Sequence, residues 1–381
     1  MNILFFATRM PDLCGAFLHD IDLAIELQKR GHQVAFMTTD KPTEGYNGGT
    51  YRGFRFMHYT AGTDLLESSQ VWICPHAPAL PVVRKINSRG LDRPMIATCH
   101  FDGRYKSITD NITGQWNEML FFINRKMESN FRANCLPWPR TIVRTDVIRP
   151  IMHEDKIRMD PFPSGDMITL VNANVNKGVH QFIELAKRMP DRRFLGVVPY
   201  YGELWVPPAP SNVEWIKFDD DVRNILRRTR ILLLPSKYES FGRIAVEAMY
   251  NKIPVVYSRP DHAAASPGTT EGVEEWIIPA GIACERDRPE QWMSVIASLD
   301  DAETYAARQE MCKECVMAMD LFTEAPRIAD KVEAFVRENP IVTKPSGGPS
   351  AVAGAAHVPR IPQMPVGSAL GFSGGRLKIR R

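Results

Sequence analysis

The sequence has no apolar run that approaches the ~20 residues needed to cross a bilayer. Its opening apolar segment, residues 3–7, is too short for the core of a signal peptide. Cysteine is scarce: the seven cysteines in 381 residues are scattered, and their spacing does not resemble a disulfide framework. We therefore expect a cytoplasmic protein whose thiols are reduced.

A large charge excess is also absent from most of the chain. The formal net charge is +3, but the last 42 residues hold six of the 47 basic side chains and no acidic one, so residues 1–339 carry 41 basic and 44 acidic groups. This balance argues against a nucleic-acid binder that works by bulk charge. Residues 340–381 are rich in Pro and Gly, and we expect a disordered basic tail that could attract an anionic polymer or a membrane surface, the latter making the protein peripheral at a membrane.

Two common nucleotide motifs are missing. No Gly-x-Gly-x-x-Gly follows the first apolar run, and the chain has no Walker motif. The main sequence evidence for a dinucleotide-dependent or an ATP-dependent enzyme is therefore missing.

The residues that are present alternate between short apolar runs and amphipathic segments, in two sets. The first set predicts strands at 2–7, 34–37, 71–74 and 95–98, with helices from about 17 to 28, at 80–87 and at 111–132. The second predicts strands at 167–171, 194–198, 231–234 and 253–257, with helices at 179–188, 221–228 and 243–250. Continuous apolar strands separated by helices indicate parallel sheets covered on both faces.

The fold class predicted is therefore α/β, with two doubly wound Rossmann-like domains facing across a cleft. We expect one Rossmann-like domain at 1–150, a second at 151–322, a C-terminal helix at 323–339 and the tail at 340–381. Ligands of such sheets bind outside the carboxyl ends of the strands, so the cleft is the expected site.

The most informative stretch is residues 231–249, in which a buried strand is followed by Glu239, by Phe241-Gly242 and, on the next helix, by Glu247. The free N–H groups at the start of that helix suit a pyrophosphate, and Gly242 permits close backbone approach. Glu247 can accept hydrogen bonds from both ribose hydroxyls. Glu239 precedes the helix and would face the sugar. The alternative is two surface glutamates on an amphipathic helix, which explains neither the Phe-Gly pair nor the strand.

This Glu-x7-Glu pattern, with Leu-Leu-Pro-Ser before it and Ile-Pro-Val-Val after it, resembles the signature of the retaining family-4 glycosyltransferases of GT-B fold, the glycosyl transferases group 1. The resemblance extends over roughly residues 1–335. It includes the Gly15 loop, His100 at a strand end and Asn176-Lys177-Gly178 before a helix. It implies catalytic roles for His100, Lys177 and Glu239. It also implies that residues 1–150 form the acceptor domain and residues 151–322 the nucleotide-sugar domain. The implied donor site comprises Gly15, Asn174, Lys177, Ser240, Phe241, Gly242, Arg243 and Glu247.

The chain also departs from that family. Asn172 and Asn174 occupy the region where the family supplies an arginine, so a phosphate-binding charge is missing or comes from elsewhere, for instance from Arg243. The family's Gly-x-Gly is reduced to the single Gly202, and Asn251 replaces a glycine before the 253–257 strand. These differences leave the shape of the nucleotide pocket open.

Two other motifs have simpler explanations. Asp219-Asp220-Asp221 matches the metal-binding Asp-x-Asp of another glycosyltransferase fold, but it precedes a helix, where capping by Asp accounts for it. Cys312-x-x-Cys315 has zinc or redox spacing, yet no second pair lies nearby, which favours two inert core thiols.

The sequence and the resemblance together predict a metal-independent retaining hexosyl- or pentosyltransferase with no cofactor. Its donor would be a UDP- or GDP-sugar, and its acceptor a glycan, lipid or small molecule. The family is associated with front-face substitution, in which the leaving phosphate assists deprotonation of the acceptor. Three alternatives remain: a transferase acting on a modified nucleic-acid base, a nucleotide-sugar epimerase or hydrolase, and a non-catalytic binding protein. No obligate protein partner is evident.

Overall fold

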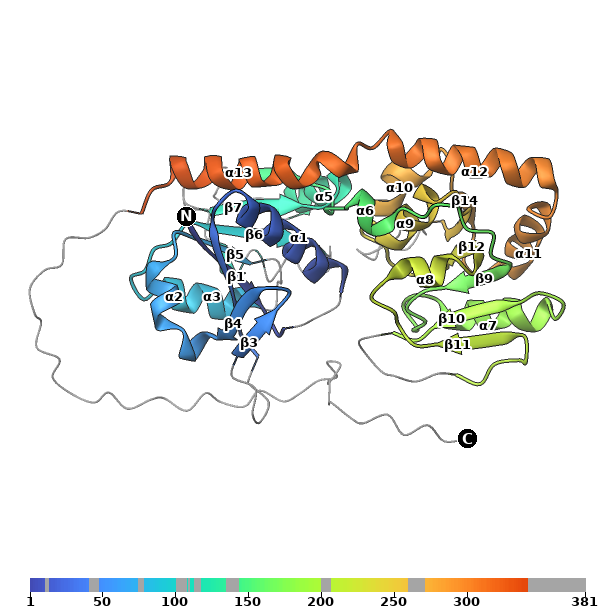
Figure 1. Cartoon of the computed structure of the whole chain (residues 1–381), viewed down its shortest axis with the longest axis horizontal. Helices are drawn as coiled ribbons and strands as arrows, with labels where there is room; N and C mark the ends of the chain where they lie inside the picture. Colours follow the sequence, from blue (N-terminus) through green and yellow to red (C-terminus); the bar gives the residue numbers. More distant parts are fainter. Residues whose placement is uncertain are drawn as a thin grey trace, which may run out of the picture.

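A computed structural model describes residues 1–10, 14–40, 48–74, 79–100, 108, 110–112, 118–134, 144–199, 207–259 and 271–341. The chain forms two α/β units side by side, the first coloured blue to cyan in Figure 1 and the second mostly green to orange. Each unit is built on one sheet, in the order that the alternating apolar runs predict. The α/β prediction is thus confirmed.

The first sheet has eight strands in the order β3-β4-β2-β1-β5-β6-β7-β8. All neighbours pair in parallel except β3 and β4. Its strands are β1 (Asn2–Ala7), β2 (Gln33–Thr38), β3 (Gly48–Tyr51), β4 (Phe54–His58), β5 (Val71–Cys74), β6 (Met95–Cys99), β7 (Glu118–Phe122) and β8 (Arg144–Val147). Its helices are α1 (Gly15–Lys29), α2 (Thr63–Ser68), α3 (Leu80–Asn87) and α5 (Arg125–Asn134), with a 3-10 turn at Tyr59–Ala61.

The helix predicted at 111–132 is wrong. Residues 118–122 form β7, which pairs with β6 and β8, and α5 begins only at Arg125. All five residues of β7 are buried. A short strand that is buried on both faces carries no period-2 pattern, so hydrophobic periodicity does not separate it from a buried helix.

The second sheet has six parallel strands in the order β11-β10-β9-β12-β13-β14. They are β9 (Met167–Leu170), β10 (Phe194–Val197), β11 (Val213–Ile216), β12 (Thr229–Leu234), β13 (Val255–Ser258) and β14 (Ile282–Cys284). Its helices are α6 (Glu154–Ile157), α7 (Val179–Arg188), α8 (Val222–Leu226), α9 (Arg243–Tyr250), α10 (Glu271–Ile277), α11 (Pro289–Ser298) and α12 (Ala302–Met317). The limits predicted for α7 and α9 are those observed.

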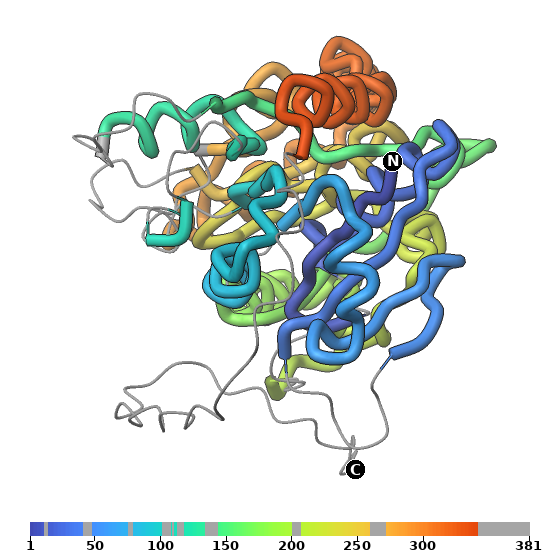
Figure 2. The backbone as a smooth tube through the Cα atoms, turned by 90° about the vertical axis from the view of Figure 1, so that its left-hand side faces the viewer, coloured from blue at the N-terminus to red at the C-terminus, as the bar shows by residue number. Residues whose placement is uncertain are grey.

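A last helix, α13 (Glu324–Glu338), follows a 3-10 turn at Leu321–Thr323 and returns to the first unit. It lies over that unit in both views (Figures 1 and 2). Arg30 Nη1 contacts Asp330 at 2.6 Å, and His32 Nε2 contacts Glu333 at 2.8 Å. These polar contacts hold α13 on the first unit, whereas α12 belongs to the second.

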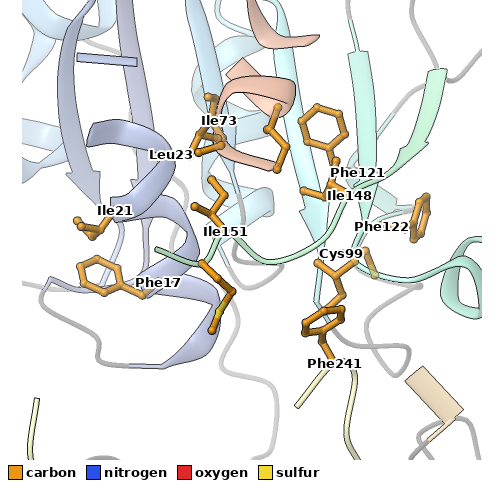
Figure 3. Close-up of a cluster of buried hydrophobic side chains, with 14 of the residues drawn as sticks. Phe17, Ile21, Leu23, Ile73, Cys99, Phe121, Phe122, Ile148, Ile151 and Phe241 are labelled. Atoms are coloured by element: carbon orange, nitrogen blue, oxygen red, sulfur yellow. The ribbon is translucent and has the colours of Figure 1, made fainter. Parts of the chain in front are cut away.

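Apolar packing also joins the two units. One continuous cluster of buried side chains contains Cys99 of the first unit and Phe241 of the second, both drawn in Figure 3. Cys312 and Cys315 belong to the same cluster, and burial raises the pKa of Cys312 to about 12, as expected for inert thiols. Within the described ranges, no helix is both long and apolar enough to span a bilayer.

Candidate donor-binding site

The loop after β9 and the loop after β12 meet at the carboxyl edge of the second sheet. An ion pair between Lys177 Nζ of the first loop and Glu239 Oε1 of the second connects the two loops. Ser236 Oγ donates to the same carboxylate oxygen at 2.8 Å, and the carboxylate is 95% buried. A second link is the hydrogen bond from Lys237 N to Asn176 O, at 2.8 Å. The structure therefore brings together two predicted site residues that are 62 positions apart in the sequence.

The backbone conformation of residues 174–178 positions Lys177. Asn174 Oδ1 accepts a hydrogen bond from the Lys177 N–H at 3.0 Å, so this asparagine shapes the loop. Gly178 has φ +83°, and a Cβ there would lie 2.3 Å from Pro235 O. Only glycine fits at this contact between the two loops.

The start of α9 is shaped by Gly242, which has φ +75° and lies immediately before the helix. Phe241 is buried, with its ring centroid 5.7 Å from that of Trp276, and Trp276 Nε1 donates to Phe241 O at 2.9 Å. Ser240 O accepts a hydrogen bond from Asn124 Nδ2 of the first unit at 2.7 Å. The Phe-Gly pair is thus a fixed turn that presents the helix N-terminus, whose free N–H groups favour anions.

Glu247 lies one turn into α9, and its carboxylate is 3.8 Å from Nε of Arg243. Burial raises the pKa of Glu247 to about 7, with Asp22 adding to the rise and Arg243 opposing it. Arg243 Nη1 donates to Ile151 O at 2.9 Å, and Nη2 lies 3.8 Å from Asp22 Oδ2. The guanidinium therefore points toward residues 148–166, the segment between β8 and β9 that joins the two units.

Two predicted residues of the first unit lie near these loops. His100 follows β6, and its carbonyl oxygen is 3.4 Å from the Tyr238 hydroxyl of the second unit. The His100 ring is buried and stands edge-on to that of His19, 5.8 Å between centroids. Gly15 begins α1, and a Cβ there would lie 3.7 Å from Arg243 Cδ. The ends of both sheets thus contribute to one region.

The triple aspartate serves as a helix cap, as predicted. Asp221 Oδ1 accepts from the Arg223 N–H at 3.1 Å at the start of α8. Asp219 accepts from the Asp221 N–H at 2.9 Å. Among the described residues, no group of three or more His, Cys, Asp or Glu side chains is arranged to hold a metal ion.

Several residues around the site were missed by sequence reasoning. His19 and Asp22 are buried on α1, one turn apart, and Asn124 lies between β7 and α5. One sequence feature could have indicated the residues of α1: His19, Asp20 and Asp22 are polar within an otherwise apolar helix segment. Asn251, noted only as a departure from a family glycine, has a positive role, because its side chain hydrogen-bonds Met159 N at 2.9 Å and Ile157 O at 2.7 Å.

Comparison with known proteins agrees with this geometry. Residues 208–314 match the family model of the glycosyl transferases group 1. Over 124 residues the chain is 29% identical to D-inositol 3-phosphate glycosyltransferase of Corynebacterium kroppenstedtii, an alignment that covers 32% of this chain and 26% of that protein. The chain thus matches about a quarter of that relative's length.

Solved structures match over most of the chain. Sucrose-phosphate synthase from Thermosynechococcus elongatus has a TM-score of 0.67 at 15% identity, covering 88% of this chain and 98% of that one. Anabaena HepE in complex with UDP-glucose has a TM-score of 0.67 at 14% identity, covering 87% and 99%. At such identities the likeness establishes the fold. That fold is the GT-B fold, and the match to the family model lies within the second unit.

Proposed function

We propose that the protein transfers a sugar from a nucleotide-sugar donor, a UDP- or GDP-sugar, to an acceptor hydroxyl with retention of anomeric configuration. The observation that carries this proposal is the Lys177–Glu239 pair beside the N-terminus of α9. It places a cation, a carboxylate and free backbone N–H groups on adjoining loops. HepE, which shares the fold, was solved with UDP-glucose, and this supports a nucleotide sugar here.

In this proposal, catalysis rests on position and electrostatics. An ammonium group has three N–H donors, so Lys177 can contact a phosphate oxygen while it keeps a hydrogen bond to Glu239. Together with the α9 N-terminus, it would stabilise the charge that develops on the leaving diphosphate. Glu239, held by Ser236, would accept hydrogen bonds from the sugar, and Glu247 from the ribose. His100 would lie against the sugar from the first unit.

No metal or other cofactor is part of the proposal. Asp219 and Asp221 use their carboxylates to hold backbone N–H groups around α8. The positive charge at the diphosphate is assigned to Lys177 and the helix N-terminus.

The acceptor is proposed by class: a glycan, a lipid or a small molecule, bound mainly by the first unit. The basic residues after Asn339, which all lie outside the described ranges, are proposed to attract an anionic polymer or membrane surface.

A panel of nucleotide sugars with and without candidate acceptors tests the function. Release of nucleoside diphosphate that depends on an acceptor, and that is lost in Glu239→Gln, is the expected result. Turnover of the donor without any acceptor would instead indicate the hydrolase or epimerase. Binding without turnover across the whole panel would indicate a non-catalytic protein.

A further inference from the structure

The segment that joins the two units is bonded to both of them at one residue. The Ile151 N–H donates to His19 Nδ1 of α1 at 3.1 Å. The Ile151 carbonyl accepts from Arg243 Nη1 of α9 at 2.9 Å. Ile151 is fully buried, and Figure 3 shows it beside α1. Its two backbone groups are therefore satisfied by side chains from opposite units, and both bonds persist only in this arrangement of the units.

A carboxylate of the first unit reinforces this contact. Asp22 Oδ1 lies 2.7 Å from Lys156 Nζ and 3.3 Å from His153 Nε2, and Oδ2 lies 3.8 Å from Arg243 Nη2. Burial opposes ionisation, but the contact with His153 and the charges of Arg243 and Lys156 lower the pKa of Asp22 to about 2. Asp22 is thus an anion at neutral pH. It faces cations from both the joining segment and α9.

The same segment is fixed to α9 at its other end. Asn251, at the C-terminus of α9, donates to Ile157 O and to Glu247 O, the latter at 2.8 Å. The Tyr250 hydroxyl also contacts the Glu154 carboxylate. Because α9 holds the segment here, the bonds to His19 and Asp22 connect α9 itself to α1.

Arg243 lies between two carboxylates, one in the contact between the units and one in the proposed donor site. Its guanidinium is 3.8 Å from Asp22 of the first unit and 3.8 Å from Glu247, the proposed ribose ligand. Its Nε is buried and makes no hydrogen bond to any residue in the described ranges. The guanidinium is therefore placed by Ile151 and by the charges on either side of it, and a change at Asp22 alters the field at Glu247.

We propose that His19, Asp22, Ile151 and Arg243 form a clamp, the linker clamp, through which Asp22 of the first unit acts as a positioning residue for donor binding by the second. Asp22 touches no reacting group; it acts by orienting Arg243 beside Glu247. The donor-affinity part of this inference rests on the proposed function, whereas the contact between the units does not. The consequence is that the donor site is complete only when the first unit is docked.

Hydrogen exchange in ligand-free protein tests the contact. Asp22→Asn and, as a second variant, His19→Ala should each accelerate exchange in residues 151–157 by about tenfold or more, with β1 and β9 unchanged. Glu26→Gln is the matched control: it removes a carboxylate one turn further along α1 that pairs with Arg30 instead. Equal protection of residues 151–157 in wild type and both variants would overturn the clamp. This arm needs no nucleotide.

Calorimetry with the nucleotide sugar that the wild type binds tests the positioning role. At about pH 8.5, where Glu247 is ionised with or without the Asp22 charge, Asp22→Asn should weaken affinity about threefold or more, and Asp22→Glu should restore part of it. In an Arg243→Gln background, the same Asp22→Asn change should lower donor affinity by less than about twofold, because Asp22 acts on Glu247 through Arg243. The same fold loss in both backgrounds, or no loss in either, would refute the role of Asp22. A wild type that binds no nucleotide sugar refutes the proposed function instead, and the exchange experiment still decides the clamp.

Discussion

Lys177 and Glu239 pair with each other across the two loops at the carboxyl edge of the second sheet. We predict that Lys177→Met lowers kcat/KM about 10²- to 10³-fold, mostly through kcat, because the charge on the departing diphosphate loses a cation. Lys187→Met, at the exposed end of α7, is the control and should retain full activity. A wild-type kcat in Lys177→Met would remove the lysine from catalysis.

Glu239→Gln should separate turnover from nucleotide binding. Glutamine keeps an acceptor for Ser236 but removes the negative charge, so sugar turnover should fall at least about tenfold while the nucleoside diphosphate binds within about twofold of wild type. Initial rates and calorimetry on the same preparation measure both quantities. If diphosphate affinity fell as far as turnover, the carboxylate would be supporting the phosphate site rather than the sugar.

Donor affinity should depend on pH through Glu247. Its carboxyl has a pKa of about 7 in the folded protein, and the ionised form is the better acceptor for ribose hydroxyls. Protonation therefore opposes binding, and affinity should rise up to about tenfold from pH 6 to pH 8. A nucleotide sugar is the ligand to use, because its diphosphate does not titrate between pH 6 and pH 8 and adds no pH dependence of its own. Glu247→Gln should flatten the profile, and a variant that kept the wild-type slope would assign the titration to another group.

Chelation should leave activity intact. Because Asp219 and Asp221 hold backbone N–H groups around α8, we expect EDTA-treated enzyme to keep most of its turnover. Asp221→Ala should cost about 0.5–2 kcal/mol of unfolding free energy, the usual value of an N-cap, without changing activity per folded molecule. Loss of activity in EDTA that manganese restores would show that the aspartates bind a metal.

Removal of the basic residues after Ile341 should leave the melting temperature and donor turnover unchanged, since their composition predicts no packed core. If the segment recruits the acceptor electrostatically, truncation should raise the acceptor KM at low salt and have less effect at high salt. Equal acceptor kinetics for both proteins at low salt would leave it without a recruiting role. A lower melting temperature would show that it packs on the body.

The sequence predicted those parts that are determined locally. The limits of α7 and α9 follow from a glycine before each helix and from apolar residues at helical spacing. β7 was mistaken for helix because its burial depends on β6 and β8, which come from elsewhere in the chain. The triple aspartate was interpreted correctly because an N-cap is a local interaction.

The same difference between local and long-range interactions decided which site residues could be predicted. Glu239, Gly242 and Glu247 could be proposed from the sequence because one strand-loop-helix segment carries them all. His19 and Asp22 were not, because their partners Ile151 and Arg243 lie more than 120 positions away. No spacing rule links such residues, so only the docking of the two units reveals them.

The most direct test of the account is calorimetric titration of a nucleotide sugar into wild type and Glu247→Ala, after a thermal-shift screen has chosen the ligand. We predict that wild type binds and that the variant, still folded, loses about 1.5–3 kcal/mol of binding free energy, the value of hydrogen bonds to a charged group. Equal affinity for the two proteins would contradict the donor site described for α9. The absence of any stabilising nucleotide sugar in the screen would contradict the proposed function itself.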